Sequence, residues 1–165
     1  MKGLNKQLKK LKLVASDCDG VLTDGGLYYF EDGSEAKRFH VMDGMGFLLL
    51  EEQGIITAII TAESTKLVEH RARKLKIDEL IMSTKDKLGA LEMLCRKHGI
   101  TMSEVCYIGD DVFDVPAIKA SGWGCVPSSA NEYIQTSADY VTKKGGGQGC
   151  FREIADMILA ARESE

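Results

Sequence analysis

The sequence lacks the features that mark several common classes of protein. None of its apolar runs approaches the roughly 20 residues that a membrane-spanning helix needs, so we expect no membrane partner. Its net charge of −4 argues against nucleic acid as a partner, because binding a phosphate backbone requires a basic surface. The basic residues 1–13 lack the apolar stretch and cleavage site of a secretory signal, and we interpret them as a solvated lead-in to the first strand.

Cysteine and histidine are also sparse, and neither type is paired in the sequence. The five cysteines include no CxxC pair and are odd in number, which indicates reduced thiols rather than a disulfide framework. The three histidines have no second His or Cys at the spacing of a zinc site. We therefore expect a cytoplasmic protein whose histidines are structural or surface residues rather than metal ligands.

Strand-like and helix-like segments alternate along the 165 residues, a length that suits one substantial core and predicts a single domain over residues 1–165. We predict strands at 13–16, 56–60, 79–82, 105–108 and 124–126, with a short one near Tyr140. Helices are predicted at 44–53, 65–75, 85–98, 115–120, 131–136 and 151–161. This alternation is typical of an α/β fold with a doubly wound parallel sheet covered on both faces.

Residues 27–40, LYYFEDGSEAKRFH, interrupt the alternation. They predict a β-hairpin around the Asp32–Gly33 turn. A parallel sheet offers no partner for such an insertion, so we expect it to pack at an interface between copies of the chain. The glycine-rich GGGQG at 145–149 lacks the Lys-Ser/Thr of a phosphate loop and is predicted to be a flexible connector.

Carboxylates are crowded into residues 15–26, ASDCDGVLTDGG. Side chains alternate along an extended chain, so Asp17 and Asp19 point the same way while Cys18 points oppositely, as a buried structural thiol. Both acids then lie at the carboxyl end of the first strand, where open parallel sheets bind ligands. By itself, a D-x-D-G sequence is more often a simple acidic turn.

Polar residues also follow the later predicted strands. Thr61 comes directly after the second strand, Lys87 lies early in the helix after the third, and the fourth strand is followed by Asp110, Asp111 and Asp114. Because the carboxyl ends of parallel strands share one edge of the sheet, carboxylates, a hydroxyl and an ammonium can converge there.

Such a cluster favours a particular chemistry. Carboxylates without His or Cys select a hard cation such as Mg²⁺, which also offsets their mutual repulsion. A hydroxyl, backbone N–H groups and a lysine beside that cation form a cage for a phosphoryl group. A carboxylate in the cage can attack phosphorus and form an aspartyl-phosphate.

These stretches resemble the haloacid dehalogenase (HAD) superfamily of phosphatases. DCDGVLTDGG, IITAE, the Lys of KDK and YIGDDVFD match its four motifs in order and spacing. The hairpin, FHVMDGMG, VEHRARKLKI and GGGQGCFREIADMIL are similar to the small members that dephosphorylate 3-deoxy-2-keto sugar acids. The resemblance implies a HAD-like Rossmannoid fold with an inserted β-hairpin and no cap domain. It also implies a homotetramer in which neighbouring subunits close the site through the hairpin and the C-terminal segment.

The resemblance also implies roles for individual residues. Asp17 would be the nucleophile, and Asp19 would protonate the leaving sugar oxygen and later deprotonate the attacking water. Asp17, the backbone carbonyl of Asp19 and Asp110 would bind Mg²⁺. Asp111 and Asp114 would orient Asp110. Thr61 would bind the phosphoryl oxygens, and Lys87 would neutralise the charges of the phosphate and of Asp17.

The resemblance leaves the substrate open between two sugar acids. The phosphatases of 3-deoxy-D-manno-octulosonate 8-phosphate carry arginines where this chain has Met42, Leu48 and Glu63. In contrast, Glu63, Arg71 and Lys74 match residues associated with specificity in the nine-carbon branch. We therefore predict a nonulosonate 9-phosphate, such as that of KDN or an N-acylneuraminate, with the octulosonate 8-phosphate as the alternative. These substrates belong to sialic acid and lipopolysaccharide biosynthesis, respectively.

A further stretch aligns with substrate-contacting residues of the family, namely His40, Asp43 and Gly44. For Asp43, a turn and the cap of its own helix is an equally good interpretation. Two rival classes are less well supported. A phosphoacceptor receiver domain has its adjacent acids early rather than late in the chain. A magnesium-dependent nucleotidyltransferase, or a regulatory domain associated with an acylneuraminate cytidylyltransferase, would have a glycine-rich nucleotide loop near the N-terminus.

Overall fold

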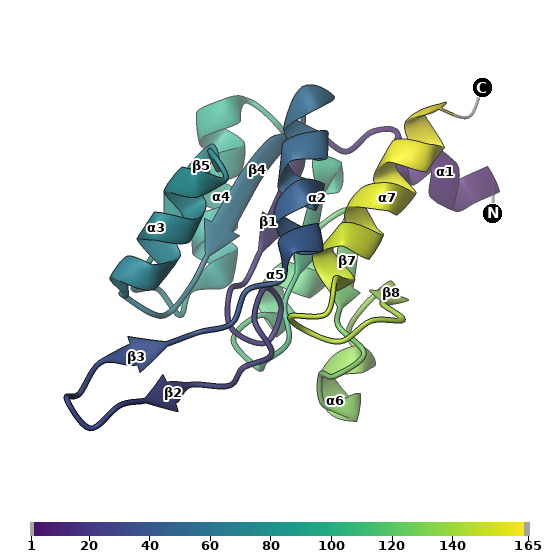
Figure 1. The fold of residues 1–165 in the computed structure, drawn as a ribbon. Helices are drawn as coiled ribbons and strands as arrows, with labels where there is room; N and C mark the ends of the chain where they lie inside the picture. Colours follow the sequence, from purple (N-terminus) through teal and green to yellow (C-terminus); the bar gives the residue numbers. More distant parts are fainter. Residues whose placement is uncertain (1, 164–165) are drawn as a thin grey trace.

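The computed structural model describes residues 2–163 and contains a central parallel sheet (Figure 1). Its strand order is β5-β4-β1-β6-β7-β8. The strands are β1 (Leu13–Ser16), β4 (Ile56–Ile60), β5 (Glu79–Ile81), β6 (Val105–Ile108), β7 (Trp123–Val126) and β8 (Tyr140–Val141). The chain builds the sheet outward in one direction from β1 and then in the other, so β1 lies at the point where the strand order reverses. Ligands of such sheets bind beyond the carboxyl ends of the strands at this point.

Helices cover both faces of the sheet, as the sequence predicts. One face carries α1 (Lys2–Leu8), α2 (Val41–Glu52), α3 (Lys66–Lys74) and α7 (Cys150–Glu163). The other carries α4 (Lys87–His98), α5 (Val115–Ala120) and α6 (Glu132–Gln135), and a short 3₁₀ helix, Met102–Glu104, precedes β6. Helices α2 and α7 lie side by side (Figure 1), and the rings of Phe47 and Phe151 stack between them, with their centroids 3.8 Å apart. The predicted doubly wound fold is confirmed.

The N-terminal segment differs from the prediction of a solvated lead-in. It contains α1, which packs near α7 (Figure 1), and it buries both Leu8 and Leu11 in the core. Lysines hide this pattern in the sequence, because Lys6, Lys9, Lys10 and Lys12 are exposed and lie between or beside the buried leucines. No helix among residues 2–163 is both long enough and apolar enough to span a membrane.

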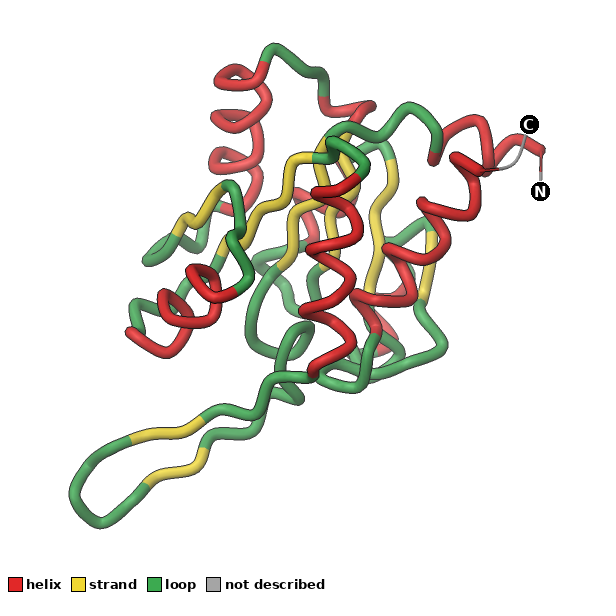
Figure 2. The backbone as a smooth tube through the Cα atoms, turned by 45° about the horizontal axis from the view of Figure 1, so that its top comes forward, coloured by secondary structure: helices red, strands yellow, loops and turns green. Residues whose placement is uncertain are grey.

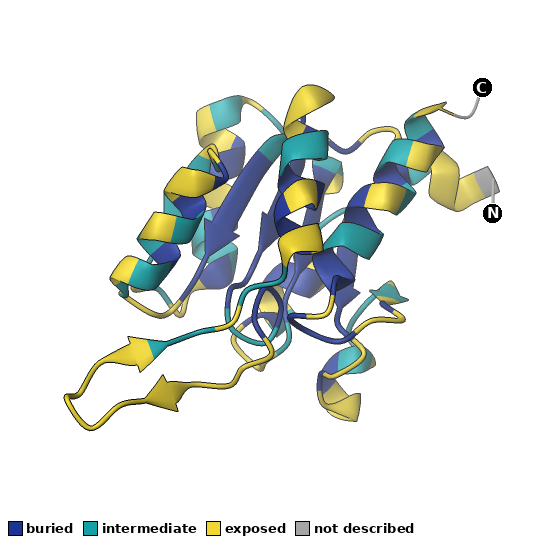
Figure 3. Cartoon of the chain, in the orientation of Figure 1, coloured by how far each residue is buried: buried dark blue, intermediate teal, exposed yellow. Residues whose placement is uncertain are grey.

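The predicted hairpin is present as β2 (Tyr28–Tyr29) and β3 (Glu35–Ala36). Its turn is stabilised by Asp32, whose carboxylate accepts hydrogen bonds from the backbone and hydroxyl of Ser34 at 2.9 and 2.6 Å. Figure 2 shows that the hairpin projects away from the sheet and its helices. Most of its residues are exposed (Figure 3), including the aromatic side chains of Tyr28, Tyr29 and Phe30.

The glycine-rich residues 145–149 form a connector to α7, but a packed one rather than a flexible one. Gly147 adopts a φ of 63° and donates a backbone hydrogen bond to Val21 at 2.8 Å. A Cβ at Gly146 would collide with the backbone oxygen of Gly20. The glycines therefore allow this connector to lie directly against the loop that follows β1.

Candidate active site

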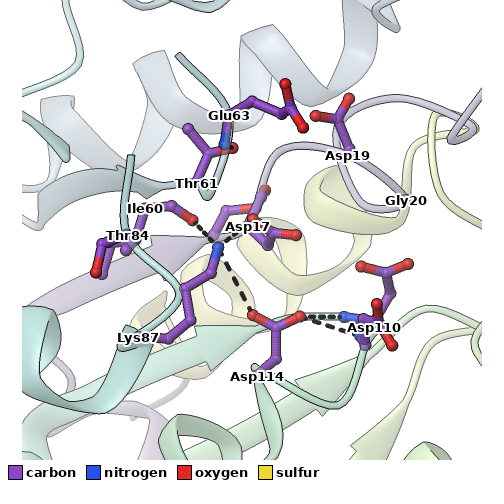
Figure 4. Close-up of polar contacts among 12 residues, drawn as sticks. Asp17, Asp19, Gly20, Ile60, Thr61, Glu63, Thr84, Lys87, Asp110 and Asp114 are labelled. Atoms are coloured by element: carbon purple, nitrogen blue, oxygen red, sulfur yellow. Dashed lines mark hydrogen bonds and ion pairs between the residues drawn. The ribbon is translucent and has the colours of Figure 1, made fainter. Parts of the chain in front are cut away.

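Loops from the carboxyl ends of the central strands enclose a cavity of about 310 Å³. Glu63 lines the cavity together with all the residues predicted to act in catalysis, to bind the metal or to orient its ligands (Figure 4, which labels all of them except Asp111). The residues with these predicted roles are Asp17, Asp19, Thr61, Lys87, Asp110, Asp111 and Asp114. These residues are far apart in the sequence and meet because β1, β4 and β6 are adjacent parallel strands.

Asp17 follows β1 directly and is paired with a buried lysine. Lys87 Nζ lies 2.5 Å from Asp17 Oδ1 and donates a second hydrogen bond to the backbone oxygen of Ile60 at 2.6 Å. Only 3% of the Lys87 side chain is exposed. Burial and the nearby charge of Asp114 raise the pKa of Asp17 to about 6, against the opposing effect of Lys87. The pair thus holds an ammonium directly against a carboxylate at the wall of the cavity.

Asp114 orders the loop after β6. Its Oδ1 accepts a hydrogen bond from the Tyr107 hydroxyl at 2.6 Å, and its Oδ2 accepts from the backbone N–H groups of Asp110 and Asp111 at 3.1 and 3.0 Å. A Cβ at Gly109 would collide with the Asp114 carboxyl group. Asp114 is therefore occupied by internal donors and determines where Asp110 lies.

Asp110 carries the clearest mark of a missing partner. Its Oδ1 is buried without a hydrogen-bond donor among the described residues. Burial, followed by the charges of Asp17, Asp114 and Asp111, raises the pKa of Asp110 to about 7. One carboxylate oxygen from each of Asp17, Asp110 and Asp114 lies within 4.8 Å of the others. Such an oxygen-only donor set, with Asp17 and Asp114 buried and Asp110 half-buried, fits a hard divalent cation.

Gly20 permits this arrangement. It has a φ of 83°, and a Cβ at this position would overlap the carboxylate of Asp110. The glycine of the D-x-D-G motif therefore does more than turn the chain, because it lets the loop after β1 approach the loop after β6. Cys18, between the two acids, is fully buried in the core and has a raised pKa because burial disfavours its thiolate.

Asp19 lies on another side of the cavity from Asp110 and Asp114, near Glu63 (Figure 4). Its Oδ1 accepts a hydrogen bond from the Thr23 hydroxyl at 3.2 Å, and its Oδ2 lies 2.7 Å from Nζ of Lys37. Burial alone would lower the pKa of Lys37, but the hydrogen bond and charge of Asp19 outweigh it and raise that pKa. Sequence analysis missed Lys37, because a lysine in a polar hairpin carries no signal of its own.

Thr61 directly follows β4 and is buried, and its hydroxyl oxygen accepts a hydrogen bond from the backbone N–H of Glu63 at 3.1 Å. The backbone of Thr61 is fixed from two sides, because its N–H donates to Ile81 and its carbonyl accepts from Thr84. The hydroxyl is thus held at the cavity wall, while the Glu63 side chain is exposed at the rim.

Other residues predicted to bind substrate lie outside this cavity. Arg71 donates a hydrogen bond to the backbone oxygen of His40 at 3.1 Å, and its guanidinium lies 5.4 Å from the ring centre of Phe39. A Cβ at Gly44 would lie 2.6 Å from the Arg71 guanidinium, so this glycine provides the space for it. Lys74 is exposed on α3. Within one chain, Arg71 therefore contacts the start of α2 through His40 and Gly44 rather than the cavity.

Asp43 does not have the capping role in its own helix that its sequence position suggested, because His40 is the N-cap of α2. It is buried outside the cavity, and its two oxygens accept hydrogen bonds from the backbone N–H groups of Gly149 and Arg152 at 3.2 and 3.0 Å. It therefore caps the start of α7 from within α2, and the alternative prediction that it caps its own helix is wrong. Burial raises the pKa of Asp43. No local pattern reveals this role, because the donors lie more than a hundred residues away.

Known proteins are similar to this chain in sequence and in fold. The model of the haloacid dehalogenase-like hydrolase family matches residues 56–154. This chain belongs to that family. The 3-deoxy-D-manno-octulosonate 8-phosphate phosphatase of Haemophilus influenzae is 36% identical over 159 residues, 96% of this chain and 88% of the relative. The corresponding Escherichia coli K12 phosphatase is 38% identical over 154 residues, 93% of this chain and 82% of the relative.

Solved structures of family members are equally similar. The 3-deoxy-D-manno-octulosonate 8-phosphate phosphatase of Moraxella catarrhalis, in complex with magnesium ion, phosphate ion and KDO, has a TM-score of 0.95 and is 41% identical. The match covers 98% of this chain and 93% of that one. The cobalt-bound phosphatase of Haemophilus influenzae has a TM-score of 0.91 at 36% identity, covering 94% and 91%. These relatives confirm that the chain is a phosphatase of the predicted HAD subfamily rather than a receiver or regulatory domain.

Proposed function

We propose that this phosphatase hydrolyses 3-deoxy-D-manno-octulosonate 8-phosphate, with Mg²⁺ as its cofactor. One observation supports the reaction above all: the ion pair of Asp17 with buried Lys87 lies in the same cavity as the unpartnered oxygen of Asp110. This arrangement suits a nucleophile, a phosphoryl group and a cation together. The substrate is suggested by the relatives, which are named for this eight-carbon sugar acid phosphate.

In the proposed first half-reaction, a carboxylate oxygen of Asp17 attacks phosphorus. The bond between phosphorus and the ester oxygen of the sugar breaks, and Asp19 donates a proton to that oxygen. Lys87 and the hydroxyl of Thr61 stabilise the charge on the phosphoryl oxygens. In the second half-reaction, water attacks the phosphorus of the acyl-phosphate and gives its proton to Asp19. Inorganic phosphate leaves and the Asp17 carboxylate is restored.

The residues that would hold Mg²⁺ are Asp17, Asp110 and the backbone carbonyl of Asp19. When bound, the cation would neutralise the repulsion among the acids and the negative charge of the phosphoryl group. Asp114 is less suited to direct binding, because its oxygens already accept hydrogen bonds from Tyr107 and from two backbone N–H groups. It orients Asp110 instead, with Asp111 as its neighbour in the same loop.

The positions of the residues that the sequence associated with specificity favour a different substrate proposal from the one made from the sequence. The sequence favoured a nine-carbon acid because of Glu63, Arg71 and Lys74, but only Glu63 lines the cavity. Arg71 is engaged by His40 and Phe39 instead. The eight-carbon phosphate is therefore the better proposal. A nonulosonate 9-phosphate remains the competing substrate to measure, because Glu63 places an acid where the octulosonate phosphatases carry an arginine.

We also propose that the active form is a homotetramer in the cytoplasm. Support for assembly comes from the hairpin, where Leu27, Tyr28, Tyr29 and Phe30 form a continuous run of exposed apolar side chains. Exposed apolar surface of this kind is typical of an interface between proteins. The five free, buried thiols suit a reducing compartment.

A kinetic comparison tests the substrate. We expect phosphate release that requires Mg²⁺ and is abolished by EDTA, with a higher kcat/KM for the eight-carbon than for the nine-carbon phosphate. The variant Glu63→Gln should change the ratio of the two kcat/KM values, because it removes a charge at the rim. Its control, Glu69→Gln, alters an acid of α3 outside the cavity and should leave the ratio unchanged. A large preference for the nine-carbon phosphate would overturn the substrate assignment and leave the reaction type intact.

A further inference from the structure

The hairpin contributes a buried charge to the cavity. Lys37 follows β3 directly, and only 2% of its side chain is exposed although most of the hairpin is open to solvent. Its ammonium forms an ion pair with Asp19 at 2.7 Å and lines the cavity. Removing a lysine ammonium from water costs free energy, and a close partner of opposite charge can offset that cost. The Asp19 carboxylate is that partner, so the two side chains hold each other in place.

The ion pair belongs to a longer contact between the hairpin and the loop after β1. Next to Lys37, Arg38 donates two hydrogen bonds to Asp24 Oδ2, at 3.1 and 2.8 Å. The following residue, Phe39, forms an isolated antiparallel bridge with Thr23. Consecutive residues of the returning hairpin strand thus contact the loop that carries Asp19, which fixes the register between the two segments.

Both oxygens of Asp19 are held, each from a different segment. Thr23, fully buried, donates to Oδ1 at 3.2 Å, and its hydroxyl oxygen also accepts from the backbone N–H groups of Gly20 and Gly25. Lys37 holds Oδ2. Without Lys37, a single neutral hydrogen bond from within its own loop would restrain the carboxylate, and rotation about its side-chain torsions would be much freer.

We propose that Lys37 is a positioning residue, which holds the Asp19 carboxylate where it can exchange a proton with the leaving sugar oxygen and with water. This inference rests on the proposed function, in which Asp19 performs both proton transfers. A proton donor must lie within about 2.6–3.2 Å of its acceptor, so a loosely held carboxylate spends little time in the productive position. The hairpin thereby takes part in the chemistry of its own chain.

The dependence on the leaving group tests this role. An alkyl phosphate such as the sugar acid phosphate or glycerol 2-phosphate needs a proton on its leaving oxygen, whereas p-nitrophenolate leaves without one. Because kcat/KM reports the steps up to departure of the leaving group, it isolates the first proton transfer from the second half-reaction. We expect Lys37→Met to lower kcat/KM for alkyl phosphates by about 10²-fold. For p-nitrophenyl phosphate, kcat/KM should fall less than about threefold, and Lys37→Arg should restore most of the difference.

The matched control is Arg38→Met, which removes the exposed ion pair one residue away and should leave both kcat/KM values within about twofold of the original. Circular dichroism and thermal unfolding establish that each variant is folded, and Lys37→Gln replaces Lys37→Met if the latter is not. An equal loss on both types of substrate, or no loss, would overturn the role of Lys37. Failure of the unaltered protein to release phosphate from any of these esters with Mg²⁺ would instead overturn the proposed function.

Discussion

The acid cluster and the hairpin are built in opposite ways, although one loop leads from the first to the second. In the cluster, Asp17, Lys87 and Asp114 are buried and held by hydrogen bonds from several strands. The hairpin has two residues in each strand and exposes its aromatic side chains. The cluster is therefore determined by the sheet, whereas the hairpin is held at its base, mainly by the buried ion pair of Lys37 with Asp19. The hairpin is thus mostly exposed in a single chain and still contributes Lys37 to the lining of the cavity.

The largest expected difference between the two regions concerns activity. Asp17→Asn removes the proposed nucleophile and should lower kcat by at least about 10³-fold on every phosphate ester. The comparable change in the hairpin, Asp32→Asn, keeps an oxygen that can accept the Ser34 hydrogen bonds and should leave kcat nearly unchanged. Steady-state phosphate release measures both. If Asp17→Asn released phosphate at the rate of the unaltered protein, the assignment of Asp17 as the nucleophile would be wrong.

A smaller effect concerns stability, pH and the cation. The pKa of Asp110 is raised from 3.8 to about 7, and that of Asp17 from 3.8 to about 6. Between pH 3.8 and these raised values, the folded protein without metal therefore binds more protons than the unfolded chain. Its free energy of unfolding should therefore fall as pH rises from about 4 to about 7. Mg²⁺ at a hundredfold excess over its Kd should raise the Tm at pH 8 by about 5–10 °C.

Two neighbouring acids provide the control for this measurement. Asp110→Asn should raise the Tm in EDTA and remove most of the gain from Mg²⁺, because it deletes a buried charge that the cation would offset. Asp111 is exposed in the same loop, and Asp111→Asn should retain most of that gain. Thermal unfolding across pH, with EDTA or Mg²⁺, gives both results. An unaltered response to Mg²⁺ in Asp110→Asn would contradict the metal assignment.

The smallest effect on the fold is expected in strand β2 of the hairpin. Tyr29 is 68% exposed, so Tyr29→Ser should change the free energy of unfolding of a dilute, dissociated chain by less than about 0.5 kcal/mol. If the hairpin forms an interface between copies, the same variant should weaken assembly, which sedimentation measures. Lys85→Ser, at an exposed position away from the hairpin, serves as the control. Assembly that is unchanged in Tyr29→Ser would remove this residue from the proposed interface.

Much of the sheet and of the acid cluster was predictable, because both depend on local pattern and one topological rule. Short apolar strands alternating with helices require a parallel sheet, and parallel strands place their carboxyl ends together. The positions of Asp17, Thr61 and Lys87 within the cavity follow from that rule. The hairpin was predictable from Asp32 and Gly33, since this pair suits a tight turn.

Other features depend on contacts that no local pattern encodes. Asp43 binds the start of α7 because α2 and α7 pack side by side. Arg71 turns toward His40 because Gly44 leaves space for it, which removes Arg71 from the cavity where its sequence position suggested a substrate contact. Burial of Leu8 and Leu11 likewise requires α7 as a partner for the N-terminal segment.

The sequence by itself determined which groups meet at one edge of the sheet, because D-x-D, Thr61, Lys87 and the later acids each follow a strand of one parallel sheet, and these are the groups to which we assign the nucleophile, the cation site and the phosphate contacts. Only the tertiary structure decided which surrounding residues line this cavity of the single chain. It brought Lys37 in beside Asp19 and kept Asp43 and Arg71 out. The reason is physical. The regular backbone pairing of the strands determines where strand ends lie, whereas the position of a charged side chain between elements depends on a partner that is distant in the sequence.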